Sequence, residues 1–346
     1  MTTTPSRLRV AVCEAGPLEP ERDAGSRAVA DMIETLGSLG HETRFLSEVD
    51  GDLVDAVTRF APDVVLVSRP GLFARVVSPL RALGVPLVYL AHDLHFVRLA
   101  LGARLGAGPD AGAARVMRLV ERHCFGAADL VLLPTDDEVR RAAVEFPGAR
   151  CLSVPYFVMP STTPPTGAPE RLELVFVGGS RHAPNPDGVG WFLEQVWPGV
   201  RRDHPGARLR VFGDWPADTA IAAVPGVEVH RGLPDAELDA AMRGATAGIA
   251  PLRFGAGMKR KTLHYLSLGL PVIGTGFSVE GLADDAGRVP GVVTAEDPRG
   301  WADALAALAD AEHWRTLSRA GREFVERRFS RSAQATALSD ALGQLR

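Results

Sequence analysis

The two lysines of the chain, Lys259 and Lys261, follow a glycine-rich turn and flank Arg260, and every other basic residue of the lysine and arginine class is arginine. Retention of lysine against such a background favours a role for a compact ammonium group, which suits a phosphate. The pattern that follows predicts a helix over Lys259–Leu268. Three cations in its first turn oppose the helix dipole unless an anion binds there. The motif therefore indicates either an anion site or a solvated basic helix start.

A second glycine-rich motif follows the predicted strand Leu172–Val177. A glycine pair that ends at Gly179 comes directly after the strand, Ser180 follows it, and Asn185 precedes the predicted helix Gly188–Val200. Paired glycines let the backbone approach a ligand closely, although a turn from strand to helix also needs glycine. Both motifs follow strands of one predicted sheet, which strengthens the interpretation as an anion site.

The first half of the chain carries a polar cluster after another predicted strand. His92, Asp93 and His95 lie within four residues of one another. They are candidates for chemistry, whereas the alternative is a helix cap from Asp93 and structural histidines. The spacing does not match a metal site, and no cysteine is near. Gly25 stands at the start of the first predicted helix, either as part of a simple capped helix or facing a ligand.

Length and composition restrict the class of protein. The chain has 346 residues, 46% of them hydrophobic, and a net charge of −4, which suits two globular domains and argues against nucleic-acid binding. The three cysteines lack metal spacing and indicate a reducing compartment. No leader-like stretch and no apolar run long enough for a membrane span is present, so we expect a cytoplasmic protein without an integral membrane segment. The absence of a GxGxxG motif after the first strand and of a Walker lysine argues against ordinary dinucleotide binding and P-loop chemistry.

Short β-rich runs alternate with helical patterns in both halves of the chain, which predicts two parallel sheets covered by helices. In the first half the expected strands are Leu8–Cys13, Glu42–Leu46, Val64–Ser68, Leu87–Leu90 and Leu130–Leu133. In the second half they are Leu172–Val177, Leu209–Phe212, Val227–His230, Gly248–Pro251, Val272–Gly274 and Val292–Thr294. The proline-rich segment Pro155–Pro169 is typical of a connector between domains, and the segment from Trp301 onward is predicted to be largely helical.

The order of these motifs resembles that of the retaining GT-B glycosyltransferases of family 4 type. The resemblance rests on the stretch from Pro251 to Leu263, on Gly269–Ile273 and Val279–Leu282, and on shorter runs at Asp23–Arg27, His92–Phe96 and Phe176–Ser180. It implies an α/β protein with two Rossmann-like doubly wound domains that face each other across a cleft. We expect an acceptor domain over residues 1–156, a linker over 157–171, a nucleotide-sugar domain over 172–330, and a C-terminal helix over 331–346 that packs back on the first domain.

The same resemblance implies roles for individual residues. The enzyme would be a hexosyltransferase that takes a nucleotide sugar as donor and a small-molecule or lipid-linked acceptor, retains configuration, and needs neither a metal nor another cofactor. His92 and Asp93 would be catalytic, with His92 near the transferred sugar. The donor-binding residues would be Gly25, Gly179, Ser180, Arg253, Gly257, Lys259, Lys261, His264 and Glu280.

One departure from the family pattern concerns two glutamates that many relatives carry eight positions apart. The first lies near the transferred sugar and the second holds the nucleotide ribose; Ala256 and His264 stand at those positions here. The departure leaves two alternatives open. One is a catalytically silent GT-B protein that binds a nucleotide sugar or a partner. The other is an enzyme with a changed reaction, such as nucleotide-sugar hydrolysis.

Overall fold

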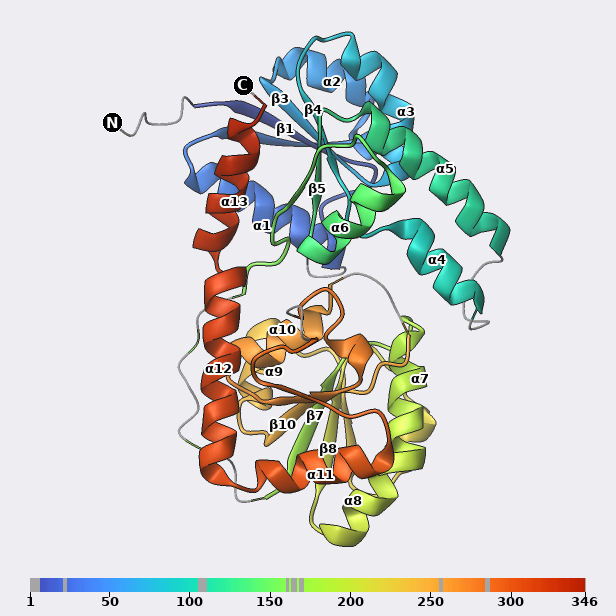
Figure 1. Cartoon of the computed structure of the whole chain (residues 1–346), viewed down its shortest axis with the longest axis vertical. Helices are drawn as coiled ribbons and strands as arrows, with labels where there is room; N and C mark the ends of the chain where they lie inside the picture. The colour runs from blue at the N-terminus through green and yellow to red at the C-terminus, as the bar shows by residue number, and fades with distance from the viewer. Residues whose placement is uncertain are drawn as a thin grey trace. The chain divides into compact units, whose positions relative to one another are not determined.

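The structure, a computed structural model, describes residues 7–20, 24–104, 111–159, 162, 167, 171–254, 258–283 and 287–345. The chain divides into two compact units (Figure 1). The first consists chiefly of residues 1–158 and 328–346, and the second chiefly of residues 159–327. In each unit helices flank a six-stranded sheet in which every pair of neighbouring strands is parallel.

The sheet of the first unit has the strand order β2-β1-β3-β4-β5-β6. Its strands are β1 (Arg9–Glu14), β2 (Glu42–Ser47), β3 (Val64–Ser68), β4 (Leu87–Leu90), β5 (Leu130–Leu133) and β6 (Cys151–Ser153). Every residue of β3, β4 and β5 is buried, because helices cover these central strands. The sequence predicts the first five strands and misses β6, a three-residue edge strand that is only half-buried.

The helices of the first unit alternate with these strands. They are α1 (Ala24–Ser38), η1 (Glu48–Asp50), α2 (Leu53–Phe60), α3 (Pro70–Arg81), α4 (His95–Arg104), α5 (Ala111–Ala127), α6 (Asp136–Glu145) and α13 (Arg331–Gly343). The last helix, α13, packs against α1. Its buried Gln334 accepts a hydrogen bond from the Thr35 hydroxyl and donates one to the Pro155 carbonyl. The end of the chain is thereby fixed to the first unit.

The sheet of the second unit has the order β12-β11-β10-β7-β8-β9. Its strands are β7 (Glu173–Val177), β8 (Arg208–Phe212), β9 (Val227–His230), β10 (Ala247–Ala250), β11 (Val272–Gly274) and β12 (Val292–Thr294). All six are predicted from the sequence to within a residue or two. Its helical elements are α7 (Pro184–Trp191), the π-helical η2 (Phe192–Val196), α8 (Trp197–Asp203), η3 (Ala220–Ala223), α9 (Asp235–Met242), α10 (Arg260–Ser267), η4 (Gly276–Ser278), α11 (Pro298–Leu308) and α12 (Ala311–Phe329).

Three buried tryptophans anchor the core of the second unit. Trp197 and Trp301 both lie against the ring of Phe192, and the Trp314 indole donates to the Thr246 carbonyl. Burial of rings of this size contributes strongly to the hydrophobic stabilisation of the unit. None of the helices in the described ranges is long and apolar enough to cross a bilayer.

The strand orders locate the places where ligands of such sheets bind. A ligand lies beyond the carboxyl ends of the strands, where the strand order reverses direction. In the first sheet the reversal falls between β1 and β3, and in the second between β7 and β10. Both sequence motifs of the predicted anion site therefore follow the strands that border the reversal in the second sheet.

Candidate functional site

Lys261 is half-buried beside the carboxyl end of β7. Its Nζ donates to Oδ1 of Asn185 over 2.6 Å and lies 4.0 Å from the centre of the Phe176 ring. Burial, with a smaller contribution from the nearby charge of Lys259, lowers the pKa of Lys261 from 10.5 to about 7. Within the described residues no carboxylate forms an ion pair with Lys261. Among the described residues this half-buried cation is supported by an amide oxygen and an aromatic face, an arrangement that suits the arrival of an anion.

Lys259 is the second cation of this group. It occupies the N-cap position of α10 and is 5% exposed. Its Nζ lies 3.6 Å from Oε2 of Glu280. The structure thus brings together two residues that the resemblance assigns to donor binding. Glu280 offsets part of the charge of Lys259, so the positive charge of the site is concentrated at Lys261.

The turn after β7 is shaped by close backbone packing. A Cβ atom on Gly178 would come within 2.6 Å of the Asn185 amide nitrogen, and the same amide donates to the Gly179 carbonyl over 2.8 Å. The backbone N–H of Ser180 donates to the Asp214 carbonyl over 3.0 Å, and the Ser180 hydroxyl donates to the same oxygen over 3.1 Å. These contacts give the glycines and Ser180 a packing role in addition to the predicted contact with a ligand.

Arg253, in the segment after β10, forms an ion pair with Asp187 in the first turn of α7. Its Nε lies 2.9 Å from Oδ2 of Asp187, and a second bond joins Nη2 to Oδ1. The pair is partly exposed and links the two segments that border the strand-order reversal. The next predicted donor-binding residue, Gly257, lies outside the described residues, as does Ala256.

His264, on α10, points at an acidic partner that the sequence did not reveal. Its Nε2 lies 2.6 Å from Oδ1 of Asp239 on α9, and both side chains are about one-fifth exposed. A carboxylate therefore stands next to the position where relatives carry glutamate, but it comes from α9. The role of His264 in donor binding stays a prediction.

His92 follows β4 in the first unit. Its Nε2 lies 2.7 Å from the Ser68 hydroxyl at the end of β3, and its ring meets that of Tyr156 edge-on at 5.4 Å. The Ser68 hydroxyl on β3 and the Tyr156 ring, which follows β6, together orient the imidazole. A histidine held in this way can present a fixed polar edge to a sugar.

Asp93 is surrounded by cations. Its Oδ1 lies 2.7 Å from Nδ1 of His95, and its Oδ2 accepts from Nε of Arg98 over 2.8 Å. Although burial alone would raise the pKa of Asp93, the contacts with His95 and then Arg98 hold it far below its ordinary value. Glu121, fully buried, accepts the backbone N–H groups of His95 and Phe96 and so caps α4. These contacts favour a positioning role for Asp93, and its catalytic role stays a prediction.

The strand-order reversal of the first sheet carries an ion pair that sequence reasoning missed. Glu14, at the end of β1, has Oε2 3.5 Å from Nε of Arg69, which follows β3. Arg69 has a φ of 71°, which is strained for a residue other than glycine. Strained backbone of this kind is concentrated at functional sites. Gly25 lies in the first turn of α1, as predicted.

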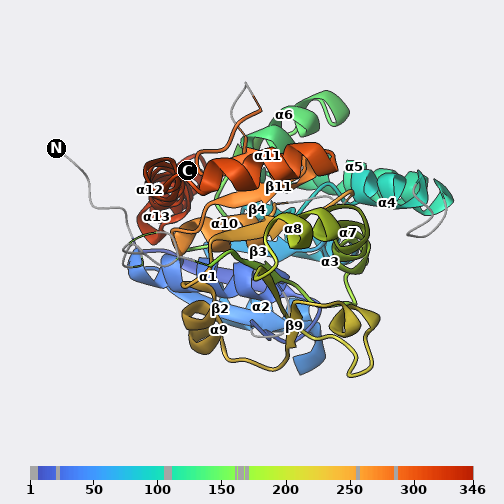
Figure 2. The same ribbon diagram turned by 90° about the horizontal axis from the view of Figure 1, so that it is seen from below.

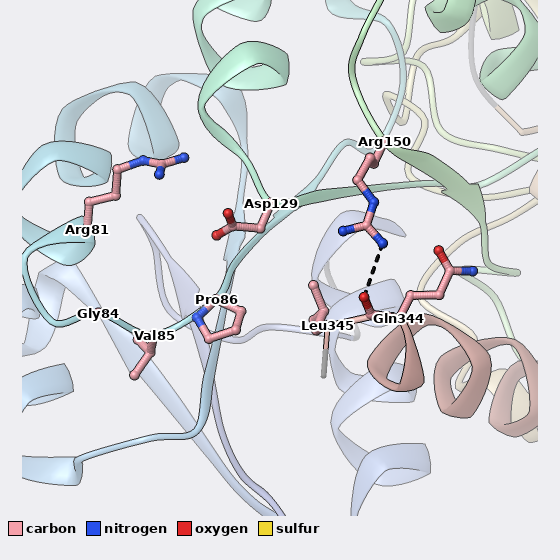
Figure 3. A pocket seen from close by; sticks show the side chains of 8 residues that line it. All are labelled: Arg81, Gly84, Val85, Pro86, Asp129, Arg150, Gln344 and Leu345. Atoms are coloured by element: carbon pink, nitrogen blue, oxygen red, sulfur yellow. Dashed lines mark hydrogen bonds between the residues drawn. The ribbon is translucent and has the colours of Figure 1, made fainter.

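An open cavity of about 440 Å³ lies at the opposite edge of the first sheet, just before β4, β5 and β6 (Figure 3). It is lined by Arg81, Gly84, Val85, Pro86, Asp129, Arg150, Gln344 and Leu345. Arg150 spans it to the Gln344 carbonyl over 3.1 Å. Because the amino ends of the strands are not where such sheets bind ligands, this cavity is not part of the candidate site. No group of three or more His, Cys, Asp or Glu side chains in the described ranges is arranged to hold a metal ion.

Comparison with known proteins agrees with this architecture. Residues 171–311 match the model of the family Glycosyl transferases group 1, and comparison with curated proteins gives no match. The sucrose-phosphate synthase of Thermosynechococcus elongatus has a similar structure, with a TM-score of 0.72 at 15% identity over 98% of this chain and 99% of that one. Anabaena HepE in complex with UDP and glucose gives 0.69 at 11% identity over 98% and 100%. A variant of S. aureus TarM in complex with fondaparinux, alpha-GlcNAc-glycerol and UDP gives 0.64 at 12% over 84% and 58%. The chain therefore has the GT-B fold of two Rossmann-like units.

Proposed function

We propose that this protein is a hexosyltransferase of family 4 type, which moves a sugar from a nucleoside diphosphate sugar to a small-molecule or lipid-linked acceptor. The observation that carries the proposal is the half-buried ammonium of Lys261 at the strand-order reversal of the second sheet, which no carboxylate of the described residues pairs. The family match over residues 171–311 and the GT-B fold support it. So does the similarity to HepE, whose structure holds UDP-glucose.

The chemistry follows from the charge of the leaving group. A nucleoside diphosphate departs with negative charge, and fixed cations stabilise that charge best in a site with little water. Lys261 supplies such a cation without an internal carboxylate to compete, whereas Lys259 shares its charge with Glu280. With these side chains in place we propose that no metal is needed. Gly179, Ser180 and the segment through Arg253 and Gly257 contribute to the same donor site. By the resemblance alone, Gly25 of α1 is also a predicted donor-binding residue.

In the proposed reaction His92 contacts the transferred sugar. Ser68 and Tyr156 fix the plane of its ring, so that the donor sugar meets a preorganised group. Configuration is retained because the acceptor hydroxyl attacks from the face that the diphosphate leaves, and a donor phosphate oxygen helps to remove its proton. Asp93 acts through His95 and Arg98, which fix the backbone that follows His92.

Thermal-shift measurements with UDP, GDP, ADP and dTDP, each with the matching nucleotide sugars, test this function first. A ligand that binds only the folded protein raises its melting temperature with concentration. The stabilising nucleotide sugar is then incubated with candidate acceptors while nucleoside diphosphate release is followed. Release that requires an acceptor supports the transferase. No stabilisation by any nucleotide sugar would contradict the proposal.

The alternative is a catalytically silent GT-B protein that binds a nucleotide sugar. The observation in its favour is that His264 stands at a family glutamate position and is already engaged by Asp239. Binding without turnover under all acceptor conditions would support this alternative. Release that does not depend on an acceptor would instead indicate hydrolysis of the nucleotide sugar.

A further inference from the structure

One side of α5 exposes apolar and basic side chains together. Val116 is 63% exposed and Leu119 is 65% exposed, and Arg115 and Arg122 are exposed beside them. Residues three, four and seven positions apart share one side of a helix, so these four side chains form a continuous surface. We call them the outward face of α5. Among the described residues only two other large apolar side chains are so exposed, Val49 and Val144, and neither lies on this helix.

The inward side of the same helix packs against the rest of the first unit. Ala114, Cys124 and Phe125 are buried, and the carboxylate of Glu121 is turned inward to cap α4. Glu121 is the one acidic residue of α5 and is inaccessible to solvent. The outward face therefore presents cations and apolar groups, and no acidic side chain of α5 lies among them.

The surroundings leave this face open. Arg118, at its margin, is bound to Glu145 of α6 over 3.1 Å, whereas Arg115 and Arg122 form no ion pair with any described residue. Figures 1 and 2 show α4 and α5 extending beyond the edge of the sheet of the first unit. A large planar partner can therefore reach the outward face of α5.

We propose that the outward face of α5 binds the surface of an anionic lipid bilayer. Arginines attract anionic headgroups, and apolar side chains on the same helix side enter the boundary between headgroups and acyl chains. A soluble anion would bind to the arginines alone, so it would not explain why Val116 and Leu119 are exposed beside them. A second copy of the chain fits less well, because a two-fold contact through this face would set arginine against arginine.

The inference stands independently of the proposed enzymatic function, because vesicle binding needs neither donor nor acceptor. If both hold, the acceptor domain of the enzyme works at a membrane surface, which favours the lipid-linked class of acceptor over the small-molecule class. Loss of nucleotide binding with intact vesicle binding would overturn only the proposed function. The reverse result would overturn only this inference.

Co-sedimentation with unilamellar vesicles tests the proposal. The full-length protein is mixed at low salt with vesicles of phosphatidylcholine alone or with about one-third phosphatidylglycerol. We expect binding only to the anionic vesicles, weakened as salt screens the charges. The variants are Val116→Gln with Leu119→Gln, Arg115→Gln with Arg122→Gln, and the control Val49→Gln, since Val49 is equally exposed at 61% but lies between two acidic residues. Each double variant should lower the partition coefficient at least fivefold, and the control should leave it unchanged.

Three outcomes would overturn the proposal. They are failure of the wild-type protein to bind anionic vesicles, binding by both double variants that equals that of the wild type, and a loss in the Val49→Gln control that equals the loss in the double variants. Sedimentation velocity on the same samples tests whether a second copy of the chain occupies this face instead. A wild-type dimer that Val116→Gln with Leu119→Gln makes monomeric, without vesicle binding, would assign the face to self-association. Far-UV circular dichroism verifies that the variants are folded.

Discussion

Each unit places charged side chains at the carboxyl end of its sheet, but the two units balance those charges differently. In the first unit Asp93 lies between His95 and Arg98, so that negative and positive charges are matched within the fold. In the second unit the half-buried Lys261 lies against the Asn185 amide and the Phe176 ring, with another lysine as its charged neighbour. One cluster is electrostatically complete, and the other has an excess of positive charge.

This difference in charge balance distinguishes a structural role from a role in ligand binding. A matched buried cluster stabilises a local conformation, in this case the turn that follows His92 and the start of α4. An unmatched, partly buried cation is costly to the free protein, and the cost is recovered when an anion binds. Under the proposed function, this difference in charge balance predicts that the second unit takes the charged part of a nucleotide sugar.

Removing the central charge of the matched cluster should have the largest effect on stability. We expect Asp93→Asn to lower the free energy of unfolding by roughly 3–5 kcal/mol, because the largely buried His95 loses its counterion and the more exposed Arg98 loses its partner. Urea unfolding at pH 7 measures this change. Since the pKa of Asp93 is lowered in the fold, its stabilising contribution is present above about pH 4, the pKa of an unfolded aspartate, and is lost as pH falls toward its folded pKa.

The control for this prediction is Asp55→Asn, which breaks the exposed ion pair with Arg59 on α2. Exposed pairs contribute little, so the control should unfold almost as the wild type does. Affinity for nucleoside diphosphate should be unchanged in both variants. Equal unfolding midpoints for Asp93→Asn and Asp55→Asn would show that the cluster is not a matched ion pair in solution.

Removing the unmatched cation should weaken ligand binding while stabilising the free protein. Methionine has nearly the length of lysine and packs well against an aromatic ring, so Lys261→Met can fill the space beside Phe176. Affinity for the nucleoside diphosphate should fall about 10- to 100-fold, as expected when a charge-assisted contact of roughly 1.5–3 kcal/mol is lost. Affinity for the nucleoside should change little. Calorimetric titration with the nucleoside diphosphate and with the nucleoside measures the two changes in affinity.

Arg181→Met provides a matched control, because Arg181 is a basic residue of the segment after β7 but is 88% exposed and paired with Asp214. It should leave affinity nearly unchanged. Lys261→Arg retains the charge with a planar group that cannot reproduce the contact with Asn185, so an intermediate loss is expected. Equal losses for nucleoside and nucleoside diphosphate in Lys261→Met would remove Lys261 from the phosphate site.

The depressed pKa of Lys261 should make donor binding depend on pH. The protonated form binds the diphosphate, so affinity for a nucleotide sugar should be constant below pH 7 and fall up to about tenfold per unit above it. The stability of the free protein should change in the opposite direction. The unfolded lysine keeps its proton up to pH 10.5, and the unfolded state therefore binds more protons between pH 7 and 10.5, which makes stability rise with pH over that range. A steep pH dependence that persists in Lys261→Met would assign the titration to another group.

The sequence predicted the strands better than the partners of the site residues. Eleven strands were located because buried parallel strands read as short apolar runs, whereas β6 was missed because Cys151–Ser153 is short and half-buried at a sheet edge. The glycine-rich turns and lysines were recognisable as motifs. The partners Asn185 and Asp239 were not, because a contact between side chains 76 or 25 positions apart depends on how helices pack. The strained φ of Arg69 likewise has no signature in residue type.

The smallest expected effect concerns His264 and its partner Asp239. We expect Asp239→Asn or His264→Ala to lower affinity for the nucleoside diphosphate only two- to fivefold, because one hydrogen bond to a ribose hydroxyl contributes roughly 0.5–1.5 kcal/mol. The sharper measurement compares the nucleoside diphosphate with its 2′-deoxy analogue. If this pair holds the ribose, the preference of the wild type for the ribose form should disappear in both variants.

Restoring the family glutamate gives the decisive form of this test. Because the imidazole nitrogen lies 2.6 Å from Asp239, His264→Glu would set two carboxylates against each other and should lower both stability and affinity. The double variant His264→Glu with Asp239→Asn removes that repulsion, and its affinity should return at least to the wild-type value. The coupling between the two changes is then measured directly by the double-mutant cycle. Additive effects, with an unchanged preference for ribose over deoxyribose in every variant, would make the pair a helix-to-helix contact between α9 and α10 and would move the ribose elsewhere in the second unit.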